Sequence, residues 1–366
     1  MDHALAAVAL LVIAATLLPM VRHDAWWVRS FDFPRAQVLV VGVAAAAGLL
    51  LRRPWSGWET ALFAALVLAL AWQVRCIAPY TPLLGKEVRA ARVRPGDAQI
   101  AILVANVLMT NRSAGELLRQ VRERQPDLVL TLEPDAWWEK ALAPLDVDYP
   151  HSVRRPLDNC YGMLLHSRLP LEDASVRFLL SAAIPSIHAR VVLPSGARCR
   201  LHCLHPEPPS PTEAERSTER DAELLVVARE VRECDEPTIV AGDLNDVAWS
   251  YTTKLFQKIS GLVDPRKGRG FYNTFDARRP WLRFPVDHVF HSTDFELLEL
   301  ARLGRFGSDH FPIFVRLVHH PAAEAVQEAP AADRRDVALA EEKIEKADAP
   351  SAPELLSPRR FRRRGA

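Results

Sequence analysis

Short polar motifs follow apolar, strand-like runs at six places in this 366-residue chain. In chain order they are Ala105-Asn106, Leu132-Glu133-Pro134, His205-Pro206, Gly242-Asp243-Leu244-Asn245-Asp246, Val286-Asp287-His288 and Ser308-Asp309-His310. Their carboxylates, amides and imidazoles can bind divalent cations, hold phosphate oxygens and move protons. Six such motifs in this order predict a divalent-metal phosphoesterase site.

Phosphoester cleavage requires an activated water, compensation of the charge on the phosphate oxygens and stabilisation of the leaving oxygen. Mg²⁺ takes oxygen ligands and keeps several waters, so a few carboxylates suffice to bind it. We therefore expect Mg²⁺ as the cofactor, with Mn²⁺ as an alternative. Asp243 and Asn245 lie two apart at a strand end, where extended backbone points both side chains the same way.

Each residue also has a simpler interpretation. Glu133 could be a carboxylate at a helix N-terminus, Asn106 a turn residue, and Asp246 a cap for the segment that follows it. His310 suits either a general base or an imidazolium that binds phosphate. The remaining histidines, among them His188 and His202, show no spacing typical of metal ligands.

The order of the motifs resembles the endonuclease/exonuclease/phosphatase superfamily, which includes DNase I, abasic-site endonucleases, neutral sphingomyelinases and inositol-phosphate 5-phosphatases. The resemblance covers about residues 99–318, and its most specific parts are residues 241–245 and 307–312. It implies a four-layer αββα sandwich, an α+β fold.

The resemblance also implies roles for individual residues. Glu133 would be the main metal ligand, with Asn106 and Asp309 beside it. Asp243 would activate the nucleophile, and His310 would pair with Asp287. His205 and Asn245 would contact the phosphate, together with Asn106.

The elements expected around these motifs are strands broken by a few helices, which agrees with a two-sheet core. Two capping boxes, at residues 113–116 and 212–215, predict helices that reach about Arg124 and Glu233. The expected strands are residues 99–104, 128–132, 161–166, 187–193, 198–204, 238–241, 286–291 and 311–317.

The N-terminal part carries three apolar runs, at residues 4–20, 36–51 and 60–72, with charges confined to the connections. Each run is slightly short for a span of about 20 residues, and flanking tryptophans extend them to the membrane interface. The alternatives are a cleaved signal peptide, which would lack its basic start here, and buried helices of a soluble domain. We expect about three transmembrane helices.

Basic residues set the expected orientation. With three spans, the first connection and the catalytic domain share one side, and six basic residues fall there: Arg22, Arg29, Arg35, Arg75, Lys86 and Arg89. The other side carries Arg52 and Arg53. The positive-inside rule then predicts a multi-pass protein of a bacterial inner membrane with a cytoplasmic catalytic domain.

The expected organisation is a membrane region (1–77), a linker (78–97), a catalytic domain (98–319) and a disordered tail (320–366) rich in Ala, Glu, Lys and Pro. The tail ends in a basic cluster at residues 359–364, which would attract anionic lipid or nucleic acid or simply be solvated. The formal net charge of +1 argues against a chain that is basic as a whole, as nucleic-acid binders often are.

The sequence thus predicts a membrane-anchored phosphoesterase acting on a phosphodiester or phosphomonoester, in nucleic acid or in a phospholipid head group. The alternatives are an endonuclease acting on DNA and a catalytically inactive binding module of the same fold. The bilayer is the expected partner of the N-terminal helices.

Overall fold

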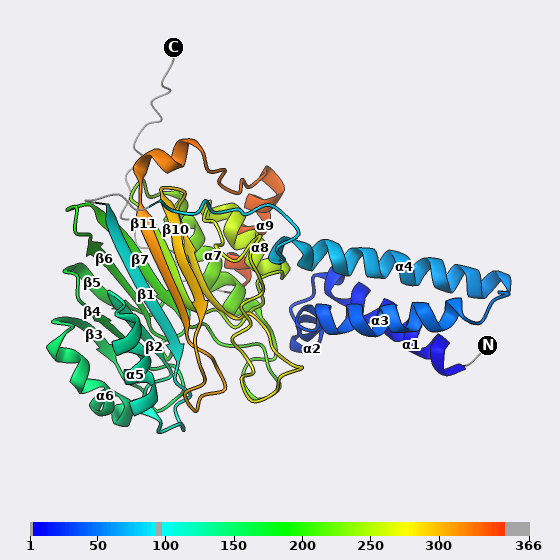
Figure 1. Cartoon of the computed structure of the whole chain (residues 1–366), viewed down its shortest axis with the longest axis horizontal. Coiled ribbons are helices and arrows are strands. Elements are labelled where there is room, and N and C mark those ends of the chain that lie inside the picture. Colours follow the sequence, from blue (N-terminus) through cyan, green and yellow to red (C-terminus); the bar gives the residue numbers. More distant parts are fainter. Residues whose placement is uncertain (1–2, 93–96, 348–366) are drawn as a thin grey trace, which may run out of the picture.

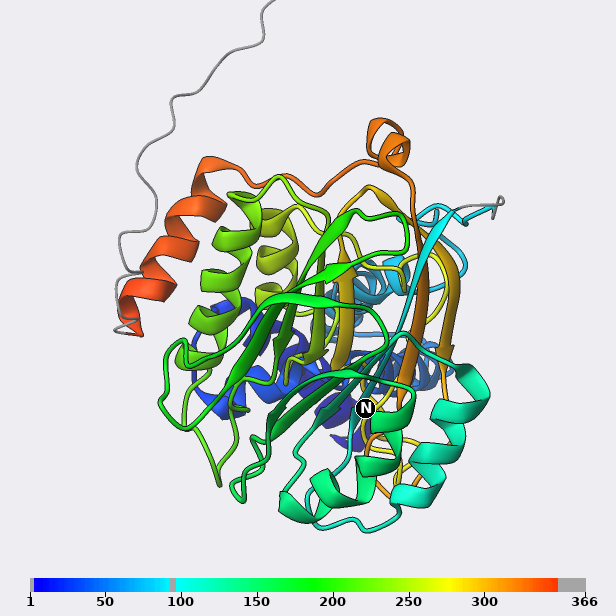
Figure 2. The same cartoon turned by 90° about the vertical axis from the view of Figure 1, so that its left-hand side faces the viewer.

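The computed structural model describes residues 3–92 and 97–347. Two mixed sheets pack face to face, and helices cover both outer faces, as the sequence predicted (Figure 2). The first sheet has the order β10-β11-β1-β2-β4-β3. Its strands are β1 (Ala98–Asn106), β2 (Leu128–Leu132), β3 (His151–Arg155), β4 (Met163–Ser167), β10 (Phe295–Arg302) and β11 (Ile313–His319).

The second sheet has the order β5-β6-β7-β8-β9. Its strands are β5 (Leu171–Arg177), β6 (Ser186–Val192), β7 (Arg198–Leu204), β8 (Thr238–Asp243) and β9 (Asp287–His291). Alternate residues of both sheets meet in one buried core, in which Ile102 and Leu130 of the first sheet and Leu201 and Ile239 of the second are buried. Because side chains alternate along a strand, each strand buries one face between the two sheets and the other face under the helices.

The outer helices pack apolar side chains on the sheets. α5 (Ala114–Arg124) and α6 (Ala136–Leu142) cover the first sheet. α7 (Thr218–Arg232) and α8 (Tyr251–Ser260) cover the second, together with α9 (Arg334–Lys346). The α5 helix was predicted with its correct end, although Ser113 makes no side-chain cap hydrogen bond.

The start of α7 was predicted wrongly. The capping box at residues 212–215 is not used, and the helix begins at Thr218 after Ser217. Residues 207–217 instead form a proline-bearing loop, in which Pro209 bridges Ala214. The backbone of Glu215 accepts a hydrogen bond from Trp26 of the N-terminal region, which holds this segment out of the helix.

The N-terminal region is a bundle that extends from one side of the sandwich (Figure 1). It contains α1 (His3–Leu17), the short α2 (Trp26–Arg29), α3 (Arg35–Leu50) and α4 (Gly57–Ile77). Two helices are long and apolar enough to cross a membrane, and α2 and α3 together, bent by 70°, would be a third.

The bundle is apolar both inside and outside. Ala9, Ala45 and Leu66 are buried between the helices. The outward side chains include Leu11, Val40 and Leu68, which are 69%, 69% and 72% exposed. An exterior this apolar suits helices surrounded by lipid.

Polar residues close the end of the bundle nearest the sandwich. Arg35 contacts Asp32 and donates to Gln73, and Gln73 donates to Thr16. The same end packs on the sandwich, where Tyr80 donates to the carbonyl of Ala248 at 2.5 Å. Bundle and sandwich are therefore joined by a buried interface as well as by the chain.

The connection and the tail both contact the sandwich. Val88 is buried in the core between the sheets, and Glu87 pairs with Lys267. Contrary to the expected disordered tail, residues 334–346 form α9, because Ala340 and Ile344 pack beside α7 and α8. The basic cluster at residues 359–364 lies outside the described residues.

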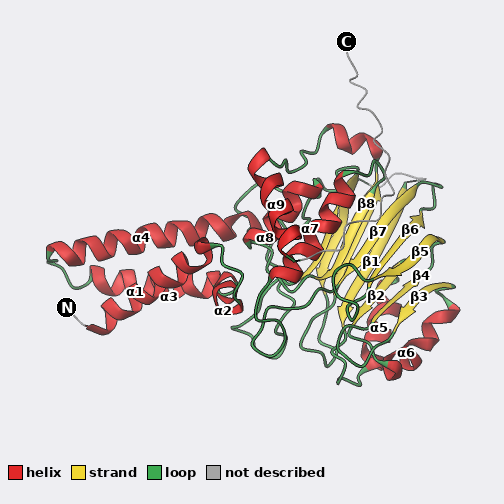
Figure 3. Cartoon of the chain, turned by 180° about the vertical axis from the view of Figure 1, so that it is seen from behind, coloured by secondary structure: helices red, strands yellow, loops and turns green. Residues whose placement is uncertain are grey.

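The predicted site residues gather because of strand direction. β1 runs parallel to β2, β7 runs parallel to β8, and β9 starts opposite the end of β8, with Asp243 facing Asp287. Asn106, Glu133, His205 and Asp243 therefore all lie at one end of the sandwich. The loops of that end face the bundle (Figure 3).

Candidate active site

Asn106 and Glu133 meet where the parallel strands β1 and β2 end. Asn106 Nδ2 donates to Glu133 Oε1 at 2.7 Å, and Asn106 Oδ1 accepts from the backbone of Leu108 at 3.0 Å. Glu133 has a φ of +63°, a left-handed conformation that is strained for a residue with a side chain. Its backbone N–H is fixed by the carbonyl of Gly162 at 2.9 Å. This strained turn aims the carboxylate at Asn106.

Asp243 links the two sheets. Its Oδ2 accepts from Asn106 Nδ2 at 3.2 Å, and its Oδ1 accepts from the backbone N–H of Asn245 at 3.0 Å. Gly242 precedes it with a φ of +149°, and a Cβ there would lie 1.9 Å from the carbonyl oxygen of Leu204. Only glycine allows β7 and β8 to approach this closely where the site residues emerge.

His310 lies between two carboxylates. Its Nδ1 is 2.8 Å from Asp287 Oδ2, and its Nε2 is 3.5 Å from Asp243 Oδ2. Ser308 Oγ accepts from the backbone N–H of His310 and donates to the carbonyl of Asn106. The Ser-Asp-His loop is thereby tied to the end of β1.

The structure places the other predicted residues around this chain of contacts. His205 Nε2 is 4.0 Å from Asp243 Oδ2. Asn245 Nδ2 donates to the carbonyl of Pro206, which fixes the amide at the rim. Asp309 pairs with Arg278 at 3.0 Å and faces the same cavity. Asp246 does not enter the cavity, because it accepts from the hydroxyl of Ser250, the N-cap of α8.

Burial and the closeness of several acids shift the pKa values of the site residues. Burial raises the pKa of Glu133 to about 7, and the carboxylates of Asp243 and Asp309 add to that rise. Burial and the charge of Asp287 raise the pKa of Asp243. Burial disfavours the charged form of His310, yet Asp287 and Asp243 outweigh it and raise the pKa of His310 to about 10.

The donor set fits a hard divalent cation. The carboxylates of Asp243 and Asp309 raise the pKa of Glu133, and an added cation would offset this crowding of negative charge. Oxygen ligands from carboxylates and an amide are those that Mg²⁺ takes. A separate group, Asp243, Asp287 and His310, has ligand atoms within 4.8 Å of one another and is a candidate metal site. In that group, Nδ1 of His310 already forms a hydrogen bond with Asp287.

Of the predicted site residues, six line a cavity of about 640 Å³: Glu133, His205, Asp243, Asn245, Asp309 and His310. The sequence analysis missed much of its wall, which comes from distant segments: Trp26, Ser30, Phe33, Pro34, Cys160, Tyr161, Pro208, Pro209, Ser210, Pro211, Thr212, Glu213, Phe275, Leu282, Phe284 and Val286. Aromatic residues and prolines dominate this set. The tryptophan at residue 26 was interpreted only as a membrane-interface residue, and the proline run at 208–211 was the one local signal of a shaped loop.

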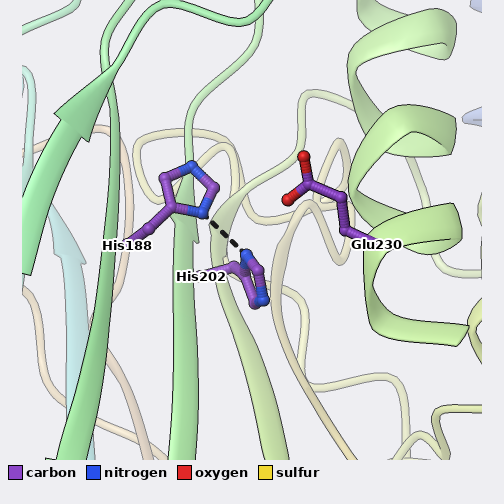
Figure 4. Close-up of side chains that lie close together, drawn as sticks. All are labelled: His188, His202 and Glu230. Carbon is purple, nitrogen blue, oxygen red and sulfur yellow. Dashed lines mark hydrogen bonds between the residues drawn. The ribbon is translucent and has the colours of Figure 1, made fainter. Parts of the chain in front are cut away.

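A second candidate metal-binding cluster, drawn in Figure 4, consists of residues that do not line this cavity. His188 Nδ1 is 2.7 Å from His202 Nδ1, and Glu230 of α7 lies beside them. The sequence spacing did not predict this pair, because His188 and His202 are neighbours only through the antiparallel register of β6 and β7. Arg177 binds both carboxylate oxygens of Glu230. Burial lowers the pKa of His202 to about 4, so the imidazole pair is neutral.

Comparison with known proteins agrees with this geometry. Residues 103–310 match the Endonuclease/Exonuclease/phosphatase family. The fold is similar to that of D. rerio TDP2 in complex with a single-strand DNA product, with a TM-score of 0.51 and 20% identity over 60% of this chain and 99% of that chain. It is also similar to the human Nocturnin catalytic domain with a bound sulfate anion, with a TM-score of 0.50 and 17% identity over 62% of this chain and 96% of that chain. No curated protein gives a significant match.

The family match spans more than half of the chain and contains all the candidate site residues. At these identities the solved structures show the fold alone, and it is the same αββα sandwich that the strand orders describe. The chain therefore belongs to the endonuclease/exonuclease/phosphatase family.

Proposed function

We propose that this protein is a membrane-anchored, Mg²⁺-dependent phosphoesterase that hydrolyses a phosphodiester or phosphomonoester. The observation that carries the proposal is one continuous set of contacts from Glu133 through Asn106, Asp243 and His310 to Asp287. These residues come from both sheets and line one cavity or lie directly behind it.

The residues divide the chemistry between them. Glu133, Asn106 and Asp309 would hold the cation, which would offset charge on the phosphate oxygens and make a water more acidic when bound. Asp243 would accept the proton of the attacking water. Asn245 and His205, which line the cavity, would contact phosphate oxygens.

Asp287 has a positioning role in this scheme. It accepts from His310 Nδ1, which leaves Nε2 to face Asp243 and the cavity. The neighbouring carboxylates favour the imidazolium, a form suited to binding a phosphate oxygen or protonating a leaving group. A buried carboxylate that fixes a histidine in this way follows the logic of hydrolase triads.

The test is turnover of bis(p-nitrophenyl) phosphate and p-nitrophenyl phosphate by the purified full-length protein in detergent. We expect activity that requires Mg²⁺ or Mn²⁺, that is lost in EDTA and that returns when the cation is restored. Asp243→Asn should lack it. If a folded, Mg²⁺-loaded wild type cleaves neither compound nor any phosphoester offered, the inactive binding module is the better description.

The anchor and its orientation are part of the proposal. The N-terminal bundle would span a bacterial inner membrane, and the arginine distribution favours a cytoplasmic catalytic domain. Val147 is 87% exposed on the catalytic domain. In a Cys160→Ser background, Val147→Cys should react with a membrane-impermeant maleimide only after the cells are permeabilised. Reaction in intact cells would place the domain outside.

A further inference from the structure

Two chemically different sets of residues line the catalytic cavity. The polar set consists of the acidic residues and histidines described above. The apolar set is Trp26, Phe33, Phe275, Leu282 and Phe284, and Phe275 packs directly on His310 with ring centroids 5.0 Å apart. A cavity with phosphate-handling residues beside an apolar wall fits a substrate that itself has both parts.

The membrane-proximal segment supplies part of the apolar wall. Trp26 and Phe33 belong to the segment between α1 and α3, and Pro34 directly precedes α3. Backbone contacts fix this segment on the catalytic domain: Trp26 donates to the carbonyl of Glu215 at 3.0 Å, and Trp249 Nε1 donates to that of Asp32 at 2.7 Å. The wall is thus built into the fold.

The catalytic domain supplies the facing wall. Phe284 meets Phe33 edge to face, with ring centroids 5.5 Å apart. The loop that carries Leu282 is tied to α3, because Gln37 donates to the carbonyl of Trp281 at 2.9 Å. Trp281 itself is 73% exposed beside this opening. Tryptophan in such a place suits the interface between water and lipid.

The charge of the wall argues against a polynucleotide. Among the described residues that line the cavity, none is Lys or Arg, while Glu133, Glu213, Asp243 and Asp309 are acidic. Proteins that hold single-stranded nucleic acid combine stacking aromatics with a basic groove that follows the backbone phosphates. Here the aromatics occur without the basic groove.

The apolar wall also adjoins α3, which with α2 would form one of the spans. Pro34 lines the cavity, and α3, one of the apolar helices with lipid-suited outer faces, begins at the next residue. A hydrocarbon chain that leaves the bilayer at this level would meet Trp26 and Phe33 before its head group reached Glu133. We propose that the substrate is a lipid phosphoester, taken from the membrane with the first part of its hydrocarbon chain against this apolar wall.

This inference rests on the proposed phosphoesterase activity and is tested with the full-length protein in phosphatidylcholine vesicles. The probes are sphingomyelin, phosphatidic acid, phosphatidylglycerol and phosphatidylinositol 4,5-bisphosphate, each compared with its water-soluble head-group phosphoester. A single-stranded oligonucleotide and bis(p-nitrophenyl) phosphate complete the set. We expect at least one lipid to be cleaved with a kcat/KM at least 100-fold above that of its soluble counterpart.

Two results would overturn the lipid assignment while leaving the proposed function intact. One is cleavage of bis(p-nitrophenyl) phosphate with no lipid in the set cleaved. The other is turnover of the oligonucleotide or of soluble head groups as good as that of the lipids. Loss of activity on every compound would instead contradict the proposed function itself.

Variants of the wall provide the second measurement. Leu282 is 37% exposed, so the polar side chain of Leu282→Asn need not unfold the protein. Leu282→Asn and Phe33→Ala should each raise the KM for the lipid at least tenfold more than the KM for bis(p-nitrophenyl) phosphate, and Phe33→Leu should restore most of the loss. The control is Trp58→Ala, an exposed tryptophan at the far end of α4, which should change neither KM (Figure 1). Equal effects of a wall variant on both substrates would contradict the proposal.

Discussion

His310 Nδ1 lies 2.8 Å from Asp287 Oδ2, and the opposite ring nitrogen faces Asp243 at 3.5 Å. Asp243 ends β8, Asp287 begins β9 and His310 lies in the loop between β10 and β11, yet the three side chains form one buried line of charged groups. Because the charge of each residue affects the protonation of the others and Asp287 orients the imidazole, we expect the three residues to act as a unit.

Asp243→Ala and His310→Ala should each lower kcat by about 10²–10⁴, the usual contribution of a positioned acid or base. The double variant should be little worse than the worse single one. Asp287→Asn should fall between wild type and those variants, because the amide still holds the ring but can fix the wrong tautomer. Steady-state kinetics with bis(p-nitrophenyl) phosphate measures all four, and multiplicative losses in the double variant would mean separate roles.

Glu133 should control cation affinity. Its carboxylate is held by Asn106 and faces two other acids, so Glu133→Gln removes a charge from the cation site while keeping the size of the side chain. We expect the Mg²⁺ concentration for half-maximal activity to rise at least tenfold, with the melting temperature in EDTA unchanged or higher. Glu139→Gln, on the adjacent α6, is the matched control and should titrate like wild type. An unaltered Mg²⁺ titration of Glu133→Gln would remove Glu133 from the cation site.

Leu68 tests the membrane assignment. It is 72% exposed in the middle of α4, where a lysine would face lipid at a cost of about 2.5–3.5 kcal/mol. Leu68→Lys should reduce the share of protein that stays in the membrane pellet after an alkaline carbonate wash. Val147→Lys adds the same charge at an exposed position of the catalytic domain and should leave that share unchanged. Wild-type protein released by carbonate would contradict membrane insertion altogether.

Glu223 should make the free energy of unfolding fall as pH rises from 4.5 to about 8. It is buried on α7, its Oε1 has no hydrogen-bond partner among the described residues, and burial raises its pKa from 4.5 to about 8. Between these two values the folded protein keeps a proton that the unfolded chain releases, so the free energy of unfolding decreases as pH rises through this window. Below pH 4.5 both states are protonated and the penalty is absent.

Glu223→Gln removes this titration. Since one pKa unit corresponds to about 1.4 kcal/mol, we expect the variant to be more stable than wild type by about 1–3 kcal/mol at pH 9. At pH 4.5 the two should melt alike. Thermal melts at both pH values measure the difference, with the exposed Glu219→Gln of the same helix as the control. A stability difference that does not change with pH would mean that Glu223 does not carry the raised pKa.

Local sequence determined the elements and the identity of the chemical groups. The apolar runs at residues 99–104 and 238–241 are strands because β-branched and aliphatic residues fill both faces, and the helix that ends at Arg124 follows from its amphipathic spacing. The order of Asn, Glu, His, Asp and His motifs at strand ends carried the family resemblance, and that resemblance implied the αββα fold. The elements and the motifs themselves are encoded by residues close together in the sequence.

Tertiary structure decided which groups meet. Asp243 and Asp287 are opposite each other only because β9 pairs antiparallel with β8, and His188 meets His202 only through the register of two strands. The start of α7 was mispredicted for the same reason, since a local capping signal lost to backbone contacts with Trp26. The apolar wall of the cavity depends on Phe33 meeting Phe284 across some 250 residues of sequence. Sequence patterns specify what one segment can do, whereas such pairings depend on the free energy of packing the whole chain, which no local pattern contains.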